Sequence, residues 1–186
     1  MKNFVAAALA VALVSGPALA DEFTDTLESA LSAYRDGNVK DAGDDLAYAT
    51  KLLGSMKSDT LAKLLPAALP GWTRAEGNDE DAGIGMAMLG GGTSAAATYS
   101  DGTNDVKITL LADSPMVSGL GAMITGVASM GGGKPIRIQR TEFSEHDGEL
   151  QGVIDKKVMV SVSGSATLEQ KTAYLEKLDF KAISAY

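Results

Sequence analysis

The sequence contains no cysteine and a single histidine, His146, among its 186 residues. Disulfide bonds, thiolate metal sites and thiol catalysis are therefore excluded. A zinc site would need carboxylates for most of its ligands, and no acidic cluster has the spacing of such a site, so we expect no metal and no cofactor. The chain must fold on its hydrophobic core alone, and residues 21–186 are enough for one compact domain.

Positive charge is also scarce. The chain has 16 Lys and Arg against 24 Asp and Glu, a formal net charge of −8. An acidic chain is repelled by phosphate backbones and by anionic lipid headgroups, and no basic patch with interleaved aromatic residues occurs. We therefore expect no nucleic-acid partner.

The longest apolar run lies at the N-terminus, in residues 4–14. It follows Lys2, is broken by Ser15-Gly16-Pro17, and is succeeded by Ala18-Leu19-Ala20, an A-x-A cleavage pattern. This run is too short for a transmembrane segment. We therefore predict that residues 1–20 are a signal peptide, cleaved after Ala20, and that the protein is exported to the periplasm without a transmembrane segment.

Residues 21–56 are predicted to form a helical hairpin. Apolar residues recur every three or four positions on both sides of Gly37, which has the place of a C-terminal helix cap. The apolar positions are Phe23, Leu27, Ala30, Leu31 and Tyr34 in the first helix, and Val39, Ala42, Leu46, Ala49, Leu53 and Met56 in the second. A third short helix is predicted from Ser58 and Asp59, which are good N-cap residues, as far as Leu65.

The stretch from Pro66 to Trp72 is predicted to join the helices to a β-rich region. Pro66 ends a helix, Pro70 favours an extended backbone, and Gly71 permits a turn. Trp72 is the only tryptophan. We expect it to open the first strand and to pack the helical hairpin onto the sheet.

Residues 70–186 read as strands joined by short turns, with two helices. Strand patterns occur at 84–89, 95–99, 106–110, from 136 irregularly past Phe143, at 150–154 and at 158–162. Turns are expected at 100–104, at Asp147-Gly148 and at Asp155-Lys156. One helix is predicted from Pro115 to Met130, and another from Thr167, where Gln170 completes a capping box.

Strands joined by short turns are antiparallel. We therefore predict an α+β fold: an N-terminal helical hairpin (21–65) packed on a mainly antiparallel sheet, with a glycine- and methionine-rich helix and a C-terminal helix (70–186). The two regions together are expected to form a single domain, 21–186. The crossover between Ala112 and Lys134 leaves room for one parallel pair.

Three resemblances bear on the fold. Ala33-Tyr34, Gly37, Ala42 and Ala49 are similar to one tetratricopeptide-type helix pair, although a single repeat makes no solenoid. Pro70-Gly71-Trp72 and the closing strand and helix, 158–178, resemble the PsbP and Mog1-like α+β fold. The Leu65-Pro66 and Gly71-Trp72 joint, the glycine-rich methionine segment and Leu178-Asp179-Phe180 resemble an uncharacterised family of small exported proteobacterial proteins, which implies no known activity.

The most unusual feature is a pair of uncharged segments, between Asp81 and Asp101 and between Asp113 and Lys134. They hold five of the eight methionines. Three interpretations remain open: a tightly packed core, a soft pocket or groove for an apolar ligand or partner, and a Cu(I) site made of thioethers. The candidate binding residues are Met86, Met88, Met116, Leu120, Met123, Val127, Met130 and Trp72.

Catalysis has little support in the sequence. His146 has Ser144, Glu145 and Asp147 as neighbours, but adjacent strand residues point to opposite faces, and His146 lies beside a predicted turn. We therefore predict an exported accessory or binding protein without catalytic activity, which engages a protein partner or an apolar small molecule through the uncharged segments. The alternatives are a hydrolase that uses a serine and His146, and a Cu(I)-binding protein.

Overall fold

The computed structural model describes residues 18–77, 91–115, 117 and 134–186. Its backbone contacts divide the chain into two compact units, Met1–Leu53 and Gly54–Tyr186, which are described in turn. The organisation of 21–186 as a single domain stays a prediction. Within the described ranges, no helix is both long enough and apolar enough to cross a membrane.

The first unit is the predicted helical hairpin. It contains α1 (Ala18–Arg35) and the first part of α2 (Val39–Ala62). Gly37 adopts a positive φ of 80° after α1, and the Asn38 N–H donates to the Ala33 carbonyl oxygen, as expected for a glycine cap. Farther from the turn, the Tyr48 hydroxyl donates to Glu22 at 2.6 Å and joins the two helices.

The prediction of a separate third helix that begins at Ser58 is wrong. α2 continues without a break to Ala62, because no glycine or proline interrupts the helical pattern between Met56 and Pro66. Ser58 does not cap a helix; its hydroxyl donates to the carbonyl oxygen of Ser94. The last turns of α2 therefore belong to the second unit, where Leu61 and Leu65 are buried in the core.

The second unit is built on a seven-stranded sheet in the order β1-β2-β3-β7-β6-β5-β4, in which every neighbouring pair is antiparallel. The α+β prediction is therefore confirmed. The strands are β1 (Thr73–Glu76), β2 (Thr93–Ser100), β3 (Asp105–Ala112), β4 (Lys134–Ile138), β5 (Thr141–His146), β6 (Glu149–Ile154) and β7 (Val158–Ser163).

The parallel pair that the sequence allowed does not form among these strands. β4 lies at the far edge and pairs only with β5, through a two-residue turn at Gln139 and Arg140. The prediction of one irregular strand from 136 past Phe143 missed this turn, because the turn contains neither glycine nor asparagine. The turns at Asp147-Gly148 and Asp155-Lys156 were predicted, and both adopt the positive φ angles that tight hairpins require.

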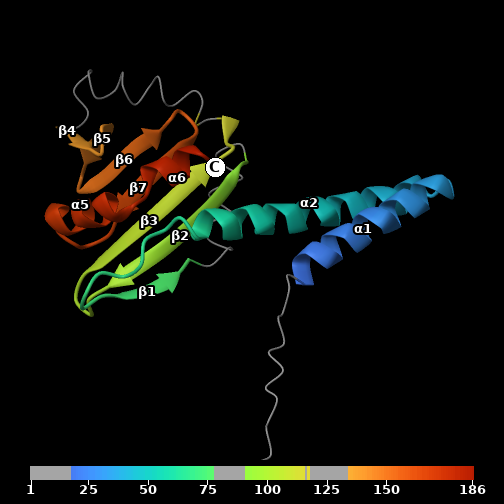
Figure 1. The fold of residues 1–186 in the computed structure, drawn as a ribbon, viewed down its shortest axis with the longest axis horizontal. Helices are drawn as coiled ribbons and strands as arrows, with labels where there is room; N and C mark the ends of the chain where they lie inside the picture. Colours follow the sequence, from blue (N-terminus) through green and yellow to red (C-terminus); the bar gives the residue numbers. More distant parts are fainter. Residues whose placement is uncertain (1–17, 78–90, 116, 118–133) are drawn as a thin grey trace, which may run out of the picture. The chain divides into compact units, whose positions relative to one another are not determined.

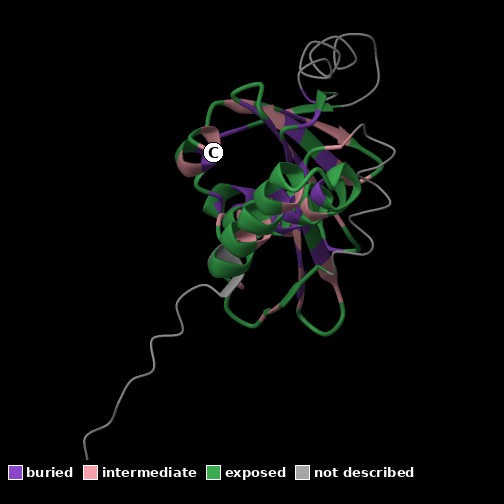
Figure 2. Cartoon of the chain, turned by 90° about the vertical axis from the view of Figure 1, so that its right-hand side faces the viewer, coloured by how far each residue is buried: buried purple, intermediate pink, exposed green. Residues whose placement is uncertain are grey.

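One face of the sheet carries the core. α5 (Leu168–Lys177) and α6 (Phe180–Ser184) lie over that face (Figure 1), and the buried residues are concentrated in the strands (Figure 2). The predicted capping box of Thr167 and Gln170 is present at the start of α5. Alternate residues of the central strands, such as Ile108 and Val160, are fully buried beneath the helices.

The stretch between α2 and β1 is held by side chains of the sheet and of α5. From β1, the Arg74 guanidinium donates to the carbonyl oxygens of Ala62, Leu65 and Pro66, at 3.2, 3.2 and 3.3 Å. From β2, the Tyr99 hydroxyl donates to the Pro66 carbonyl oxygen at 2.7 Å. The Tyr174 hydroxyl of α5 accepts the Leu69 N–H at 3.2 Å. These side chains therefore satisfy four backbone groups between the end of α2 and β1.

Tyr99 predicts a pH dependence of stability. Burial raises the pKa of Tyr99 from 10.0 to about 12, so the hydroxyl stays neutral in the folded protein while it ionises in the unfolded chain. The contribution of Tyr99 to the free energy of unfolding should therefore be constant below about pH 10 and should fall by about 2 kcal/mol between pH 10 and 12. Urea unfolding at several pH values measures this loss.

The control is Tyr99→Phe, which has no ionisable group at this position. Tyr174 and Tyr186 also have raised pKa values, so the variant should keep part of the alkaline loss, but its slope should be shallower than that of the wild type. Identical slopes in the two proteins would contradict the assignment.

Candidate functional site

Trp72 is the one predicted site residue that the structure describes. Its backbone N–H donates to the Leu69 carbonyl oxygen at 2.9 Å, immediately before β1. The half-buried indole packs against the core and meets the ring of Tyr174 edge-on, with 5.5 Å between ring centroids. Tyr174 in turn lies 4.3 Å from the ring of Tyr99. This contact with α5 was not predicted. It makes Trp72 part of a cluster of three rings, with Tyr174 and Tyr99, which packs beside the stretch between α2 and β1.

The other predicted site residues lie outside the described ranges. They are Met86, Met88, Met116, Leu120, Met123, Val127 and Met130. The strand predicted at 84–89 and most of the helix predicted from Pro115 lie outside them too. The core, pocket and Cu(I) interpretations of the uncharged segments therefore stay predictions.

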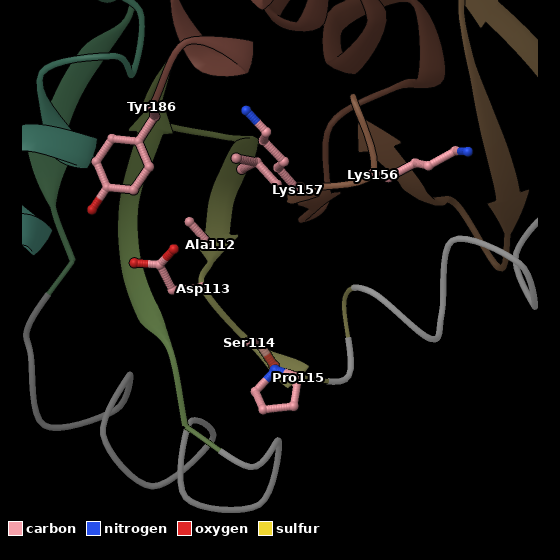
Figure 3. Close-up of a pocket in the computed structure, with 8 residues that line it drawn as sticks. Ala112, Asp113, Ser114, Pro115, Lys156, Lys157 and Tyr186 are labelled. Carbon is pink, nitrogen blue, oxygen red and sulfur yellow. The ribbon is translucent and has the colours of Figure 1, made fainter.

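The described residues form a pocket of about 450 Å³ at the end of the sheet where β3 ends and β7 begins. We call it the sheet-end pocket. Its lining combines the ends of these strands, the β6–β7 turn and the last residue of the chain, as Figure 3 shows. The lining residues are Ala112, Asp113, Ser114, Pro115, Lys156, Lys157, Val158 and Tyr186.

The pocket has an apolar part and a charged part. Ala112 and Val158 are each 1% exposed and end the buried faces of their strands, and the ring of Tyr186 packs partly on the core beside them. The Tyr186 hydroxyl donates to the Lys57 carbonyl oxygen at 3.1 Å, and burial raises the pKa of this tyrosine. The aromatic ring is thereby fixed from two sides.

Three lysines and two aspartates set the charge of this region. Lys57 Nζ lies 2.8 Å from Asp113 Oδ2, and this hydrogen bond raises the pKa of Lys57. Lys157 donates to the Ser184 carbonyl oxygen at 3.4 Å and lies 3.9 Å from Asp155. Lys156 extends away from Tyr186 in Figure 3, at the outer side of the lining. The lysines exceed the aspartates, so the pocket suits an anionic group.

Backbone strain coincides with this site. Asp113 has a φ angle of 55°, in the left-handed region that residues other than glycine rarely adopt, whereas the φ of 58° at Lys156 is what the β6–β7 hairpin turn requires. Such residues are concentrated at ligand sites in known proteins. The sequence signalled neither residue as special: Asp113 was seen only as part of a helix start, and Lys156 only as part of a turn. Their proximity depends on the pairing of β3 with β7.

His146 ends β5 at the edge of the Asp147-Gly148 turn. Its Nε2 lies 3.3 Å from Asp147 Oδ2, and the two side chains are 73% and 91% exposed. Among the described residues, no group of three or more acidic or histidine side chains is placed to hold a metal ion. His146 lies beside this turn, as the sequence predicts, and its side chain is exposed.

Comparison with known proteins gives no relative: no family model, no curated protein and no solved structure matches the chain. The resemblances to the PsbP and Mog1-like fold and to the exported proteobacterial family therefore stay predictions.

Trp72 can be tested as a structural residue. Trp72→Ala removes the indole from the three-ring cluster, and we expect a loss of about 3 kcal/mol in the free energy of unfolding, through cavity formation. Trp72→Phe keeps a ring against Tyr174 and should lose less. Urea unfolding followed by circular dichroism measures both. A loss below about 1 kcal/mol for the alanine variant would show that the indole contributes little to the fold and would favour a binding role.

Proposed function

We propose that the protein is an exported periplasmic binding protein without catalytic activity, and that its sheet-end pocket takes an apolar small molecule that carries an anionic group. The observation that carries this proposal is the combination of Val158, Ala112 and the Tyr186 ring with Lys156 and Lys157 around one cavity. Its volume of about 450 Å³ lies in the range typical of small-molecule sites.

The apolar side of the lining favours a hydrophobic ligand body. Burying apolar ligand surface contributes about 25 cal/mol per Å², and Pro115, Val158 and the Tyr186 ring offer carbon atoms for such contacts. A small number of polar groups then fixes the orientation of the ligand. Lys156 has no partner among the described residues, and a carboxylate or sulfonate near it gains a charge-assisted hydrogen bond.

The sequence position of the pocket connects it with the uncharged segments. Asp113, Ser114 and Pro115 line it; Asp113 precedes the second uncharged segment, and Ser114 and Pro115 are its first two residues. A ligand in the pocket therefore lies beside the start of the segment that contains Met116 and Met123. In this proposal the methionines supply further apolar contact. A protein partner bound by the same segments is the competing possibility.

A hydrolase that uses His146 has weaker support. General-base catalysis depends on a histidine that is held near its nucleophile and shielded from water. The side chains of His146 and Asp147 are mostly exposed, on a hairpin turn. His146→Ala should therefore leave ligand binding unchanged, and a lost esterase activity in this variant would favour the enzyme instead.

The proposal is tested with two dyes of similar shape. 1-Anilinonaphthalene-8-sulfonate is apolar and anionic, whereas N-phenyl-1-naphthylamine lacks the sulfonate. We expect both dyes to bind the wild-type protein. Replacing both pocket lysines, Lys156→Gln with Lys157→Gln, should weaken the sulfonate dye about fivefold and leave the neutral dye unchanged, because only the sulfonate gains from the charges. Pro115→Asp should weaken both dyes.

The matched control removes two charges elsewhere. Lys107 on β3 and Lys181 on α6 are exposed and lie outside the pocket lining, so Lys107→Gln with Lys181→Gln should bind both dyes like the wild type. The proposal fails if neither dye binds the wild type, or if the control and the pocket variant lose affinity equally. Met123→Asp then tests whether the second uncharged segment supplies apolar contact: we expect this variant to bind both dyes more weakly.

A further inference from the structure

The sheet has a second face, opposite the one that α5 and α6 cover. Side chains alternate between the two faces along each strand, so the residues between the core positions point to this second side. We call it the far face. In β2, β3, β6 and β7 it consists of Ser94, Ala96 and Thr98; Lys107, Thr109 and Leu111; Glu149, Gln151 and Val153; and Met159, Ser161 and Ser163.

One end of the far face is buried. Along β3 its side chains change from the exposed Lys107 through the half-buried Thr109 to Leu111, which is only 3% exposed. The strand register places Ser94, 9% exposed, on one side of Leu111 and Met159 on the other. The regular alternation of buried and exposed residues in β3 therefore breaks where the strand ends, because something packs on both faces there.

This buried end does not belong to the main core. The core cluster includes Leu110 and Ala112, on either side of Leu111, but it does not include Leu111 itself. Val117, shortly after the end of β3, is 1% exposed and is likewise outside that cluster. Apolar side chains buried apart from the main core require other apolar residues around them. A smaller second core therefore begins on the far face.

The connection from β3 to β4 has to cross the sheet. These two strands run in the same direction, with β7, β6 and β5 between them. The chain therefore returns along the length of the sheet and moves sideways by about 19 Å, at about 4.8 Å for each strand. The core face is already occupied by α5, α6 and the last turns of α2, in which Leu61 is fully buried. The far face is the one that remains.

The usual handedness of such connections gives the same answer. A connection between two strands that run in the same direction in one sheet is right-handed in about 98% of known cases. Seen from the side of α5 and α6, as in Figure 1, β3 points to the upper right and β4 lies to its left. A right-handed connection to a strand on the left passes behind the sheet, which is the side of the far face.

The sequence of this connection suits a layer on a sheet. Residues 114–133 carry no charge, and Leu120, Met123 and Val127 recur at three- and four-residue spacing, on one side of a helix. As a helix, residues 115–130 would span about 24 Å, at about 1.5 Å per residue. Strands of five to eight residues, such as β4 and β3, have a similar length. The connection is therefore long enough to return across the sheet.

We propose that residues 118–133 pack against the far face of the sheet, where their apolar side covers Leu111, Met159 and Val153. The opposite side of the segment, made of glycine, alanine, serine and threonine, faces outward. This layer begins beside Pro115, which also lines the sheet-end pocket, so a ligand there would touch its edge. The placement itself does not depend on a ligand in the pocket.

Thiol labelling tests this placement, because the chain has no cysteine and an introduced thiol is the only one. Leu111→Cys and Leu110→Cys, each in the full chain, should both react slowly with a maleimide; Leu110 is 0% exposed and points to the core face. Replacing Leu120, Met123 and Val127 together by serine should speed the reaction of Leu111→Cys about tenfold and leave that of Leu110→Cys unchanged, because only the far face loses its cover.

The outcomes distinguish the possible covers. An unchanged rate at Leu111→Cys overturns the proposal, and so does an equal acceleration at Leu110→Cys, which would show that the segment supports the main core instead. A rate that rises only when residues 84–89 are replaced by serine assigns the cover to the first uncharged segment. A rate that rises on dilution assigns it to a second copy of the chain. Either of these results also overturns the proposal.

A second measurement needs no disruption of the segment. Met159→Cys is combined in turn with a cysteine at Leu120, Met123 or Val127, on the apolar side of the segment, or at Ala122, on its small-residue side. Under mild oxidation, the fastest of the first three pairs should form a disulfide within one chain at least about fivefold faster than the Ala122 pair, because a disulfide needs closely placed Cβ atoms. Equal rates, or disulfides that form only between chains, overturn the proposal.

Discussion

The carbonyl groups that every helix leaves unpaired at its C-terminus are the constraint on which the second unit depends. The last carbonyls of an α-helix have no partner within the helix and carry its negative dipole end. Here, side chains from the sheet and its turns supply donors to them. Arg74 of β1 donates to the carbonyl oxygen of Ala62, the last residue of α2, and to those of Leu65 and Pro66 in the stretch that follows the helix. A positive guanidinium at this end of α2 is also favoured by the dipole.

The same arrangement recurs at the other two helices of this unit. The Gln139 amide, in the β4–β5 turn, donates to the carbonyl oxygens of Leu175, Glu176 and Leu178 at the end of α5. Lys157, beside the β6–β7 turn, donates to Ser184 at the end of α6. Each helix is thus fixed to a different part of the sheet. Since Lys157 also lines the sheet-end pocket, helix capping and the candidate site share a residue.

A buried lysine of α5 also donates a hydrogen bond to a backbone carbonyl, in this case one in a turn of the sheet. Lys171 of α5 is only 4% exposed, and its Nζ donates to the Gly148 carbonyl oxygen at 2.6 Å. The Gly148 N–H donates to Glu145, so both backbone groups of this turn glycine are satisfied. A charge buried with one strong acceptor costs less than one without a partner, and its position fixes the turn against α5.

The sequence predicted those features whose causes are local. Gly37 ends α1, Asp147-Gly148 forms a hairpin, and Thr167 with Gln170 caps α5, because each depends on residues close in the chain. The Gln139-Arg140 turn was missed because its positive φ angles occur without glycine, next to contacts with α5 some 36 residues away. The prediction of a helix start at Ser58 failed for a similar reason: the hydrogen-bond partner of its hydroxyl, Ser94, is 36 residues away.

The candidate site likewise combines residues that the sequence indicates locally with contacts between residues far apart in the chain. Composition indicated Trp72, the only tryptophan. It could not indicate the partner ring, Tyr174, because the packing of α5 brings that residue to Trp72. The sheet-end pocket depends on the pairing of β3 with β7 and on the position of the last residue, Tyr186. The apolar residues of α1 and α2, by contrast, recur at a local spacing that the sequence shows, and only their exposure required the structure.

The central claim, that donors from the sheet hold the helix ends, is tested most directly at Arg74. Its side chain is 24% exposed, so its hydrogen bonds are partly shielded from water. Arg74→Met keeps the length of the side chain and removes the donors, while Lys107→Met removes an exposed cation from β3 as a control. In urea unfolding, we expect a loss of about 2 kcal/mol or more in the free energy of unfolding for Arg74→Met and about zero for Lys107→Met. A loss below about 0.5 kcal/mol at Arg74 would contradict it.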